Sequence, residues 1–215
     1  TCTMIITVFE DSNYSSSFPL NINRASCELR CGAFTNLERI NNLLSAEDSI
    51  QLVVRDKLTT LMKERYPNLT VNPEMVSQGI WLNGRGLWNE NKLIEITSSR
   101  SYTNNGILMA IQNHEDIPLT EFHQYLDSAS LVSTEIVIQF IKNVWDGIFL
   151  QSEVIAADAQ NFIDYKQGDI HPTVAIENGD NVFIDGGASV RAGSVLDASE
   201  GPIIIADNAY IDIGS

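Results

Sequence analysis

From residue 184 onward the sequence repeats with a period of six, which neither a helix nor an ordinary strand produces. Large aliphatic residues recur at this step, namely Ile184, Val190, Leu196, Ile205 and Ile211. The repeat is interrupted at residues 199–202 and then returns in register. A small residue follows four positions after most of these aliphatic residues: Ala188, Ser194, Ala209 and Ser215. A helix repeats every 3.6 residues and a strand every two. A left-handed parallel β-helix explains the period, because each hexad forms one flat face of a triangular coil with its aliphatic residue inside. Antiparallel hairpins with glycine turns are the alternative.

The first 120 or so residues alternate between strand-like and helix-like stretches. Runs of β-branched, aromatic and other apolar residues predict five strands, at 5–9, 50–54, the stretch around Val71, 80–82 and 107–111. Thr35 and Glu38 have the spacing of a capping box, so we expect a helix to begin there, and residues 56–65 predict another helix. This alternation is typical of an α/β fold, in which helices wrap a parallel sheet.

After Pro118 the apolar pattern becomes helical. Leu119, Phe122 and Leu126 would form the apolar face of one helix. A second helix is indicated by the spacing of Ile136, Phe140, Ile141, Val144 and Ile148. We interpret this stretch as a pair of packing helices that closes the first domain. The sequence therefore predicts an α/β domain at residues 1–165, a linker at 166–180 and a β-helix at 181–215. The repeats run to Ser215 without a polar capping segment, so we expect the β-helix to continue beyond this chain.

Charge and cysteine usage exclude several classes of function. Lys and Arg together number 13 against 28 Asp and Glu, which gives a formal charge of −15 and argues against binding to a nucleic-acid backbone. The apolar start of the chain is too short for a membrane span and has no Lys or Arg before Arg24, so we expect neither a membrane segment nor a secretory signal. Cys2, Cys27 and Cys31 form no disulfide or zinc pattern. We interpret them as reduced thiols of a cytoplasmic protein.

Four strings of the sequence resemble one family. They are FPLNINRASCELRCG at residues 18–32, WLNGR at 81–85, VWD at 144–146, and the entry into the hexad repeats at 181–205. Together they resemble the sugar nucleotidyltransferases related to the bifunctional N-acetylglucosamine-1-phosphate uridylyltransferase and glucosamine-1-phosphate N-acetyltransferase. The resemblance implies a Rossmann-type nucleotidyltransferase domain followed by a β-helix. It also implies a reaction in which a sugar-1-phosphate attacks the α-phosphorus of a nucleoside triphosphate and pyrophosphate leaves, assisted by Mg²⁺. The full-length protein would be a homotrimer.

The sequence departs from this family at points that matter chemically. No glycine precedes Gly32, although a glycine-rich loop usually cradles the triphosphate, and the first lysine is Lys57. Asn83 occupies the place where a magnesium-binding aspartate is expected, so no metal ligand is assigned. We therefore expect phosphate neutralisation from Arg24 and Arg30 as the catalytic residues.

The remaining candidate residues are assigned to substrate binding: Asp11, Glu28, Asn83 and Arg85. Each assignment has a structural alternative. Glu28 and Arg30 could pair with each other or with neighbours, Asp11 could cap the loop after the first strand, and Asn83 could be a turn residue before Gly84.

Acetyl transfer requires a base, commonly histidine, and we place none of His114, His123 and His171 within the repeats. Any acetyltransferase residues are therefore expected beyond Ser215. The alternative function is a degenerate, non-catalytic protein that binds a sugar nucleotide or positions a β-helix trimer.

Overall fold

The computed structural model describes residues 4–96, 101–130, 133–165 and 168–215, so Cys2 lies outside the described residues. The chain divides into two compact units. The first consists of Thr1–Arg30 with Phe34–Gly147, and the second of Cys31–Ala33 with Ile148–Ser215. The division thus falls earlier along the chain than the boundary at residue 165 that the sequence indicates.

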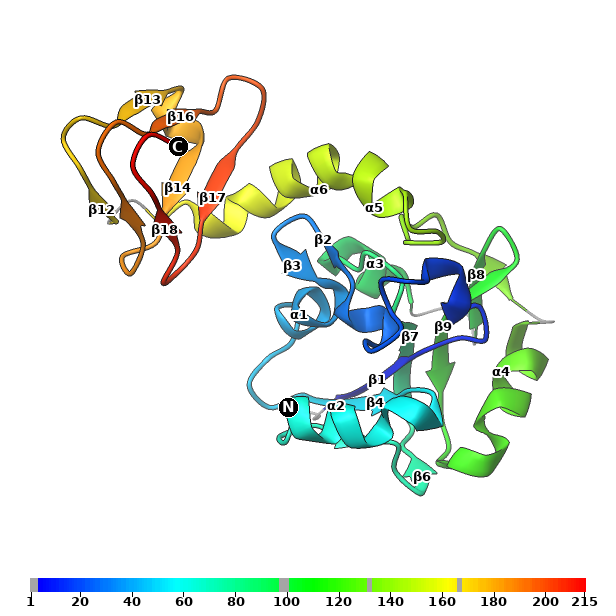
Figure 1. Cartoon of the computed structure of the whole chain (residues 1–215). Coiled ribbons are helices and arrows are strands. Elements are labelled where there is room, and N and C mark those ends of the chain that lie inside the picture. The colour runs from blue at the N-terminus through cyan, green and yellow to red at the C-terminus, as the bar shows by residue number, and fades with distance from the viewer. Residues whose placement is uncertain (1–3, 97–100, 131–132, 166–167) are drawn as a thin grey trace. The chain divides into compact units, whose positions relative to one another are not determined.

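A seven-stranded mixed sheet forms the centre of the first unit (Figure 1). Its strands, in spatial order, are β11 (Thr134–Glu135), β8 (Ser101–Asn104), β9 (Ile107–Asn113), β7 (Gly79–Asn83), β1 (Ile5–Phe9), β4 (Ser49–Val53) and β5 (Thr70–Val71). The central strand β1 runs parallel to β4 and β7, and β5 is parallel to β4, whereas β9 is antiparallel to β7 and β8. The predicted α/β domain with a mostly parallel sheet is confirmed.

Helices cover both faces of this sheet. They are α1 (Asn36–Asn41), α2 (Thr59–Arg65), α3 (Glu90–Glu95) and α4 (Phe122–Ser130). Apolar residues of β1 such as Ile6 and Val8 pack with α1 and α2, whereas Phe9 at its end packs with Phe122 of α4 on the opposite face. Successive strand residues point to opposite faces, so a single strand supplies both apolar layers. Shorter elements complete this part of the chain: η1 (Tyr14–Ser17), η2 (Ser26–Glu28), β2 (Arg30–Cys31), β3 (Phe34–Thr35), η3 (Asp56–Leu58), β6 (Met75–Val76), β10 (Ile117–Pro118) and η4 (Leu119–Glu121).

The predicted capping box at the start of α1 is confirmed. The Thr35 hydroxyl accepts a hydrogen bond from the Glu38 backbone N–H at 3.1 Å, and the Glu38 carboxylate accepts one from the Thr35 N–H at 2.7 Å. Two N–H groups that a helix start leaves without partners are thus satisfied reciprocally. The cap also fixes where the chain turns from β3 into α1.

The helix predicted over residues 136–148 is wrong. Ile136, Ile138 and Ile141 are buried, whereas Val137 between the first two is 79% exposed, which is the alternation of an extended chain. This segment pairs with the sheet and with the loop after β7: the Ile136 N–H donates to the Thr103 carbonyl at 2.8 Å, and that of Ile141 to the Arg85 carbonyl at 2.9 Å. Tertiary pairing therefore prevailed over the apparent helical spacing, and only α5 (Asp146–Phe149) is helical there.

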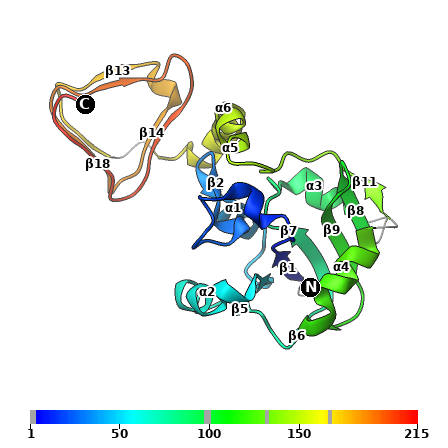
Figure 2. The same cartoon turned by 45° about the vertical axis from the view of Figure 1, so that its right-hand side comes forward.

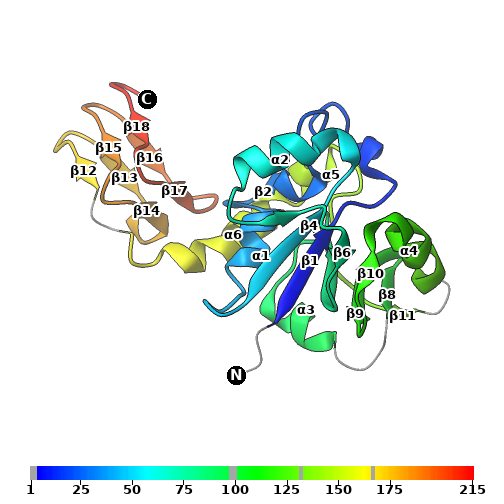
Figure 3. The same cartoon turned by 90° about the horizontal axis from the view of Figure 1, so that it is seen from below.

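The second unit contains a coil of short parallel strands. Each turn brings the chain back beside the previous one, so that β12 (Asp169–Ile170), β15 (Ser189–Val190) and β18 (Tyr210–Ile211) lie side by side (Figure 3). The second row pairs β13 (Ala175–Glu177) with β16 (Val195–Asp197), and the third pairs β14 (Val182–Ile184) with β17 (Ile203–Ile205). Figure 2 shows the three-sided outline of this coil. Its parallel pairing differs from that of antiparallel hairpins. Three helical segments, α6 (Gln151–Asp158), η5 (Ala159–Phe162) and η6 (Gly179–Asn181), complete the unit.

The aliphatic residues of the hexad pattern face the inside of the coil. Ile184, Val190, Leu196 and Ile205 are buried, and Ile211 is half-buried and packs against them. Two features differ from the sequence-based expectation. Strands β12 and β13 lie within the stretch assigned to the linker, and His171 follows β12 directly, donating its backbone N–H to the Val190 carbonyl at 2.9 Å. His171 therefore lies in the first turn of the coil, ahead of the hexad repeats.

Candidate functional site

Polar side chains gather where β1, β4 and β7 end. These three neighbouring strands are parallel, so their carboxyl ends meet at one edge of the sheet, the usual ligand-binding edge of open α/β sheets. Phe9 pairs with Asn83 in the register of β1 and β7, and the Gly84 N–H donates to the Phe9 carbonyl at 2.8 Å. The chain therefore places Glu10 and Asp11 beside Asn83 and Arg85.

Asp11, Asn83 and Arg85 form one hydrogen-bonded cluster, hereafter the strand-end cluster. The Asn83 amide N–H groups donate to the Asp11 carboxylate and to the Leu108 carbonyl, both at 2.9 Å, and the Arg85 guanidinium donates to the same carboxylate oxygen. The Asn83 amide oxygen accepts the Arg85 backbone N–H at 3.0 Å. Asn83 and Arg85 are fully buried, and the Asp11 side chain is 12% exposed. Three residues that the sequence analysis assigned to substrate binding thus lie together.

Gly84, between two members of this cluster, needs to be glycine for steric reasons. A Cβ atom at this position would lie 2.9 Å from Cys27 Cβ. The close approach brings the loop after β7 against η2. The Asn36 side chain at the start of α1 donates to the Gly84 carbonyl at 2.9 Å, which holds the loop from a second side.

The strand-end cluster does not fit a divalent cation. The Asp11 oxygen that faces the cluster accepts from Asn83 and Arg85, and the Asn83 oxygen is occupied by an N–H group. A guanidinium at this position would also repel Mg²⁺, whose preferred ligands are carboxylate oxygens and water. Across the described residues, no three His, Cys, Asp or Glu side chains gather in a way that could hold a metal ion. We therefore derive no step through a metal bound to this cluster.

A second buried ion pair, Glu10 with Arg55, was not identified from the sequence. Glu10 directly follows β1, and its carboxylate accepts from the Ser26 N–H at 2.9 Å, the Ser26 hydroxyl at 3.0 Å and the Arg55 guanidinium at 2.6 Å. The Arg55 backbone N–H donates to the same carboxylate at 3.2 Å. Arg55 follows β4 by two residues. Its position just after a predicted buried strand is the signal that could have identified it.

Arg55 also fixes the loop that carries Arg24. Its guanidinium donates to the carbonyls of Asn21, Ile22 and Arg24, the last two at 3.2 Å, and it stacks over the Tyr14 ring at 4.6 Å from the centroid. One cation thus binds three backbone carbonyl groups of a loop that contains no glycine. The loop is fixed by side-chain hydrogen bonds, whereas a glycine-rich phosphate loop relies on backbone shape.

The sequence-predicted arginines occupy different surroundings. Arg24 is exposed at the end of the fixed loop, and its guanidinium makes no hydrogen bond or ion pair with any residue that the structure describes. Arg30 instead pairs with Glu38 of α1 at 3.2 Å, with the two side chains 55% and 51% exposed. Exposed pairs of this kind contribute little to stability, about 0–1 kcal/mol. The structure does not bring Arg30 into the strand-end cluster.

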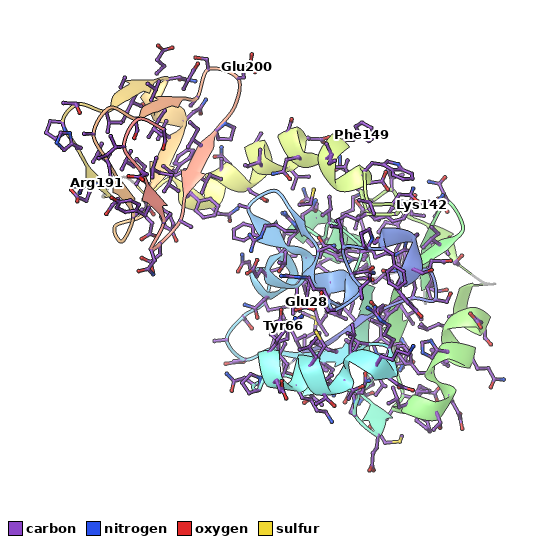
Figure 4. All side chains as sticks on the ribbon, viewed as in Figure 1. Glu28, Tyr66, Lys142, Phe149, Arg191 and Glu200 are labelled. Atoms are coloured by element: carbon purple, nitrogen blue, oxygen red, sulfur yellow. The ribbon has the colours of Figure 1, made fainter. Side chains whose placement is uncertain are left out.

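Glu28 lies in a network of its own with Arg65 and Tyr66. Its carboxylate accepts from the Ala25 N–H at 2.8 Å, from Arg65 at 3.0 Å and from the Tyr66 hydroxyl at 3.2 Å, and Figure 4 shows Glu28 and Tyr66 side by side. Burial and the Glu28 carboxylate raise the pKa of Tyr66, so its hydroxyl keeps its proton and remains a donor. All of these contacts hold the loop from inside. Glu28 thus pairs with a neighbour, and that neighbour is Arg65 and not Arg30.

Cys27 does not serve as a nucleophile in this structure. It is buried between Glu28 and Glu10, and burial followed by these carboxylates raises the pKa of its thiol. The thiolate is the reactive form, so a raised pKa makes the residue inert. Cys27 packs instead as a small apolar side chain beside Gly84.

A pocket of about 280 Å³ opens next to Asp11. The loop after β1 provides Asp11, Ser12 and Asn13, and helix α4 provides His123 and Asp127. The fold and these polar groups define an α/β protein with a pocket at the carboxyl edge of its parallel strands, and this pocket is the candidate ligand site.

Comparison with known families agrees with this class. The family described as sugar nucleotidyl transferase matches residues 6–166, most of the chain, and the protein belongs to this family. Its chemistry is nucleotidyl transfer on sugars, with nucleotide and sugar phosphate substrates. No match is found among curated proteins. The resemblance is thus confirmed for the family, and the closer relation to the bifunctional enzyme stays a prediction. In the part of the chain that the structure describes, no helix is both long and apolar enough to cross a membrane.

Proposed function

We propose that the first unit transfers a nucleotidyl group from a nucleoside triphosphate to a sugar-1-phosphate. A phosphate oxygen of the sugar-1-phosphate attacks the α-phosphorus, the bond between the α-phosphorus and the bridging oxygen breaks, and pyrophosphate leaves with that oxygen. UTP and N-acetylglucosamine-1-phosphate are the substrate pair that the resemblance implies. The family match over residues 6–166 carries this proposal.

Arg24 is the residue to which we assign phosphate binding. Its guanidinium is exposed, and the loop beneath it is fixed through the carbonyl groups that Arg55 binds. A fixed loop reduces the entropy lost when the cation meets a phosphate, and a guanidinium can donate two parallel hydrogen bonds to phosphate oxygens. Arg30 remains a secondary candidate, since a phosphate would have to compete with Glu38 for it.

The strand-end cluster has a positioning role in this proposal. Arg85 and Asn83 donate hydrogen bonds to the Asp11 carboxylate, so the position of this carboxylate is fixed before a substrate binds. Mg²⁺ has no assigned ligand in the cluster, and the dependence of the reaction on Mg²⁺ is therefore a measured variable in the assay below.

Pyrophosphate release tests the proposal directly. Nucleoside triphosphates and sugar-1-phosphates are assayed as a panel, with and without Mg²⁺, and we expect release that requires both substrates. Arg24→Ala should weaken phosphate binding ten- to a hundredfold, because a charge-assisted hydrogen bond contributes about 1.5–3 kcal/mol. Arg191→Ala, at an exposed arginine of the coil, is the matched control (Figure 4). Unchanged binding in the Arg24 variant would contradict the assignment.

A second function, non-catalytic binding of a sugar nucleotide, is favoured by one specific observation. The Arg85 guanidinium lies at the strand ends where the resemblance places a metal carboxylate, which is what a family member without catalysis would show. Binding of a sugar nucleotide by calorimetry without pyrophosphate release from any pair would establish this function instead.

For the second unit we propose a left-handed β-helix. Parallel pairing in three short sheets and the inward aliphatic residues support it. The resemblance further implies a homotrimer and an acetyltransferase activity. The His171 ring is hydrogen-bonded through Nδ1 to the Thr173 hydroxyl at 2.9 Å, and we assign it no role in this activity. Sedimentation of this chain would test the trimer.

A further inference from the structure

A groove lies between α1 and the turn after α2, close to the start of β4. Two adjoining pockets of about 340 and 430 Å³ form this α1–α2 groove, and they share part of their lining: Asn41, Ile50, Asn68 and Leu69. Among the described residues that line it, none belongs to the strand-end cluster. The groove lies where β4 begins, whereas the strand-end cluster lies where the parallel strands end. A compound in the groove would therefore leave the candidate ligand site open.

One half of the groove has an apolar floor and an aromatic wall. Leu37 of α1 and Ile50 of β4 are buried beneath it, and the turn after α2 provides Tyr66, Pro67 and Leu69. The Leu69 N–H donates to the Tyr66 carbonyl at 3.0 Å, which fixes this turn. Aromatic side chains pack well against other rings, either stacked or edge to face. This half of the groove therefore suits a planar ring.

The charged groups of the groove already have partners. Arg65 pairs with Glu28 at 3.0 Å, and Glu38 pairs with Arg30 at 3.2 Å. Both oxygens of the Asp48 carboxylate accept hydrogen bonds from neighbouring groups, at 2.7–3.0 Å. Two carboxylates and one guanidinium are the charged groups of the described lining, which disfavours an anion. Since all three are engaged, the groove suits a neutral ligand.

Two side-chain amides are available for hydrogen bonding. Asn41 on α1 and Asn68 in the turn after α2 line both pockets. Neither side chain makes a hydrogen bond with any residue that the structure describes. Each amide offers both N–H donors and a carbonyl acceptor. A ligand that carries an amide group of its own can satisfy both kinds of group at once.

Two residues of the groove wall also hold the loop that carries Arg24. The Arg65 guanidinium donates to the Asn23 carbonyl at 2.9 Å and to the Glu28 carboxylate at 3.0 Å. The Tyr66 hydroxyl donates to the same carboxylate at 3.2 Å, as their positions in Figure 4 show. Glu28 in turn accepts the backbone N–H that directly follows Arg24, at 2.8 Å. A compound that immobilises Arg65 and Tyr66 would thus restrain the backbone on both sides of Arg24.

We propose that the α1–α2 groove binds a small neutral compound with a planar ring and an amide group, and that its binding restrains the loop around Arg24. The ring packs against the apolar half, and the amide binds Asn41 and Asn68. The site itself is independent of the proposed function. Its consequence, a changed affinity for phosphate at Arg24, rests on that function and makes the groove a regulatory site.

NMR signals of the asparagine side chains test the site directly. The full chain is isotopically labelled at asparagine nitrogen, and Asn41→Ala, Asn68→Ala and Asn42→Ala each assign one side-chain signal by its loss. Benzamide is the probe. Benzoate replaces its amide with a carboxylate, and cyclohexanecarboxamide replaces its planar ring with a saturated one. We expect saturable shifts of Asn41 and Asn68 with benzamide, and binding of the other two probes that is weaker by about tenfold or more.

The alanine variants measure what the amides contribute. Asn41→Ala should weaken benzamide binding about three- to tenfold, observed at the Asn68 signal, because one neutral hydrogen bond is lost. Asn42→Ala is the matched control, since this neighbouring amide is exposed and does not line the groove. Asn41 is exposed as well, so the fold should persist in both variants. Equal affinities of the two variants, or tighter binding of benzoate than of benzamide, would overturn the assigned ligand class.

Hydrogen exchange tests the effect on the loop. Saturating benzamide should slow the backbone exchange of residues 21–28, followed by mass spectrometry. Tyr66→Phe keeps the ring and removes the hydroxyl that binds Glu28. This variant should still bind benzamide, observed at the Asn68 signal, and protect the loop less than the unaltered protein does. Benzamide binding without any change in the exchange of the loop would overturn the coupling.

The outcomes separate this proposal from the proposed function. Benzamide shifts at Asn41 and Asn68 without pyrophosphate release from any substrate pair would support the groove and contradict nucleotidyl transfer. Pyrophosphate release with no such shifts would overturn the groove and leave the transfer standing.

Discussion

The two units differ in which side chains they bury. In the first, the described interior includes ionisable groups at the carboxyl edge of the sheet, namely Glu10, Glu28 and Arg85. In the coil of the second, the residues described from 168 onward bury aliphatic side chains, alanines and Phe183, with Ser194 as the polar exception. Burying a charge is costly unless it is paired, so buried charges need specific partners, whereas an aliphatic stack needs only the right size and period. Specific partners therefore fix the buried charges of the first unit, whereas regular apolar packing fixes the interior of the coil.

Tryptophan positions allow the two units to be followed separately. All three tryptophans, Trp81, Trp88 and Trp145, belong to the first unit. Tryptophan fluorescence therefore reports the unfolding of the α/β unit, and circular dichroism reports both units. The three predictions below use this difference.

The largest effect is expected from breaking the buried pair of the strand-end cluster. Arg85→Leu leaves the Asp11 carboxylate without its cation, and removing one partner of a buried pair costs about 3–5 kcal/mol. Urea unfolding followed by tryptophan fluorescence measures this loss. Arg30→Leu, which breaks an exposed pair, should change the same transition by about 1 kcal/mol or less. Adding Asp11→Asn to Arg85→Leu should restore part of the stability. Equal effects of the two arginine changes would remove the distinction between buried and exposed pairs.

A somewhat smaller loss of stability is expected from a change in the coil, and this change should not affect the strand-end cluster. Ile184→Ala removes a buried side chain that is 3% exposed, and such changes cost about 2–5 kcal/mol. We expect the dichroism transition to move and the fluorescence transition to stay. Ile213→Ala, at a side chain that is 72% exposed, is the control and should be close to neutral. If fluorescence moved as much as dichroism in the Ile184 variant, the two units would unfold as one.

The smallest expected effect is on how the stability of each unit depends on pH in the acid range. The Ser45 hydroxyl, helped by the Met4 and Ser45 N–H groups, lowers the pKa of Asp48 in the first unit, and Ser199 lowers that of Asp197 in the coil. A lowered pKa stabilises the fold above the unfolded-state value of about 3.9, and this contribution is lost as pH falls through the folded-state pKa. Between about pH 5 and pH 2, Asp48→Asn should therefore flatten the pH dependence of the fluorescence transition. Asp197→Asn should flatten only that of dichroism, and the reverse assignment would contradict the comparison.

Several elements could be predicted from the sequence because their signals are local. The strand at residues 5–9 is a run of β-branched and aromatic residues, and the cap at Thr35 needs only Glu38 three residues later. The candidate site was predicted less completely. Asp11 was identified from its place after the first strand and Asn83 from the family resemblance. Glu10 and Arg55 were missed, because their pairing joins residues 45 positions apart in the chain.

The helix predicted over residues 136–148 is an element that the sequence predicted and the structure does not form. Its apolar spacing is compatible with a helix when the segment is considered alone. Hydrogen bonds to Thr103, Arg85 and Leu87 instead hold the segment extended. A local pattern cannot include the free energy of pairing with a distant sheet, which is why tertiary context overrides it.

By itself, then, the sequence determined the features that repeat or that act between near neighbours: the alternating α/β elements, the inward aliphatic residues of the coil and the resemblance to a family. Only the tertiary structure decided which charges pair. It placed Arg30 with Glu38, Glu28 with Arg65, and Arg85 with Asp11, and it left Arg24 exposed. The physical reason is that periodicity is set by the backbone geometry of each element, whereas the pairing of a buried charge depends on which distant groups the folded chain brings within hydrogen-bond reach.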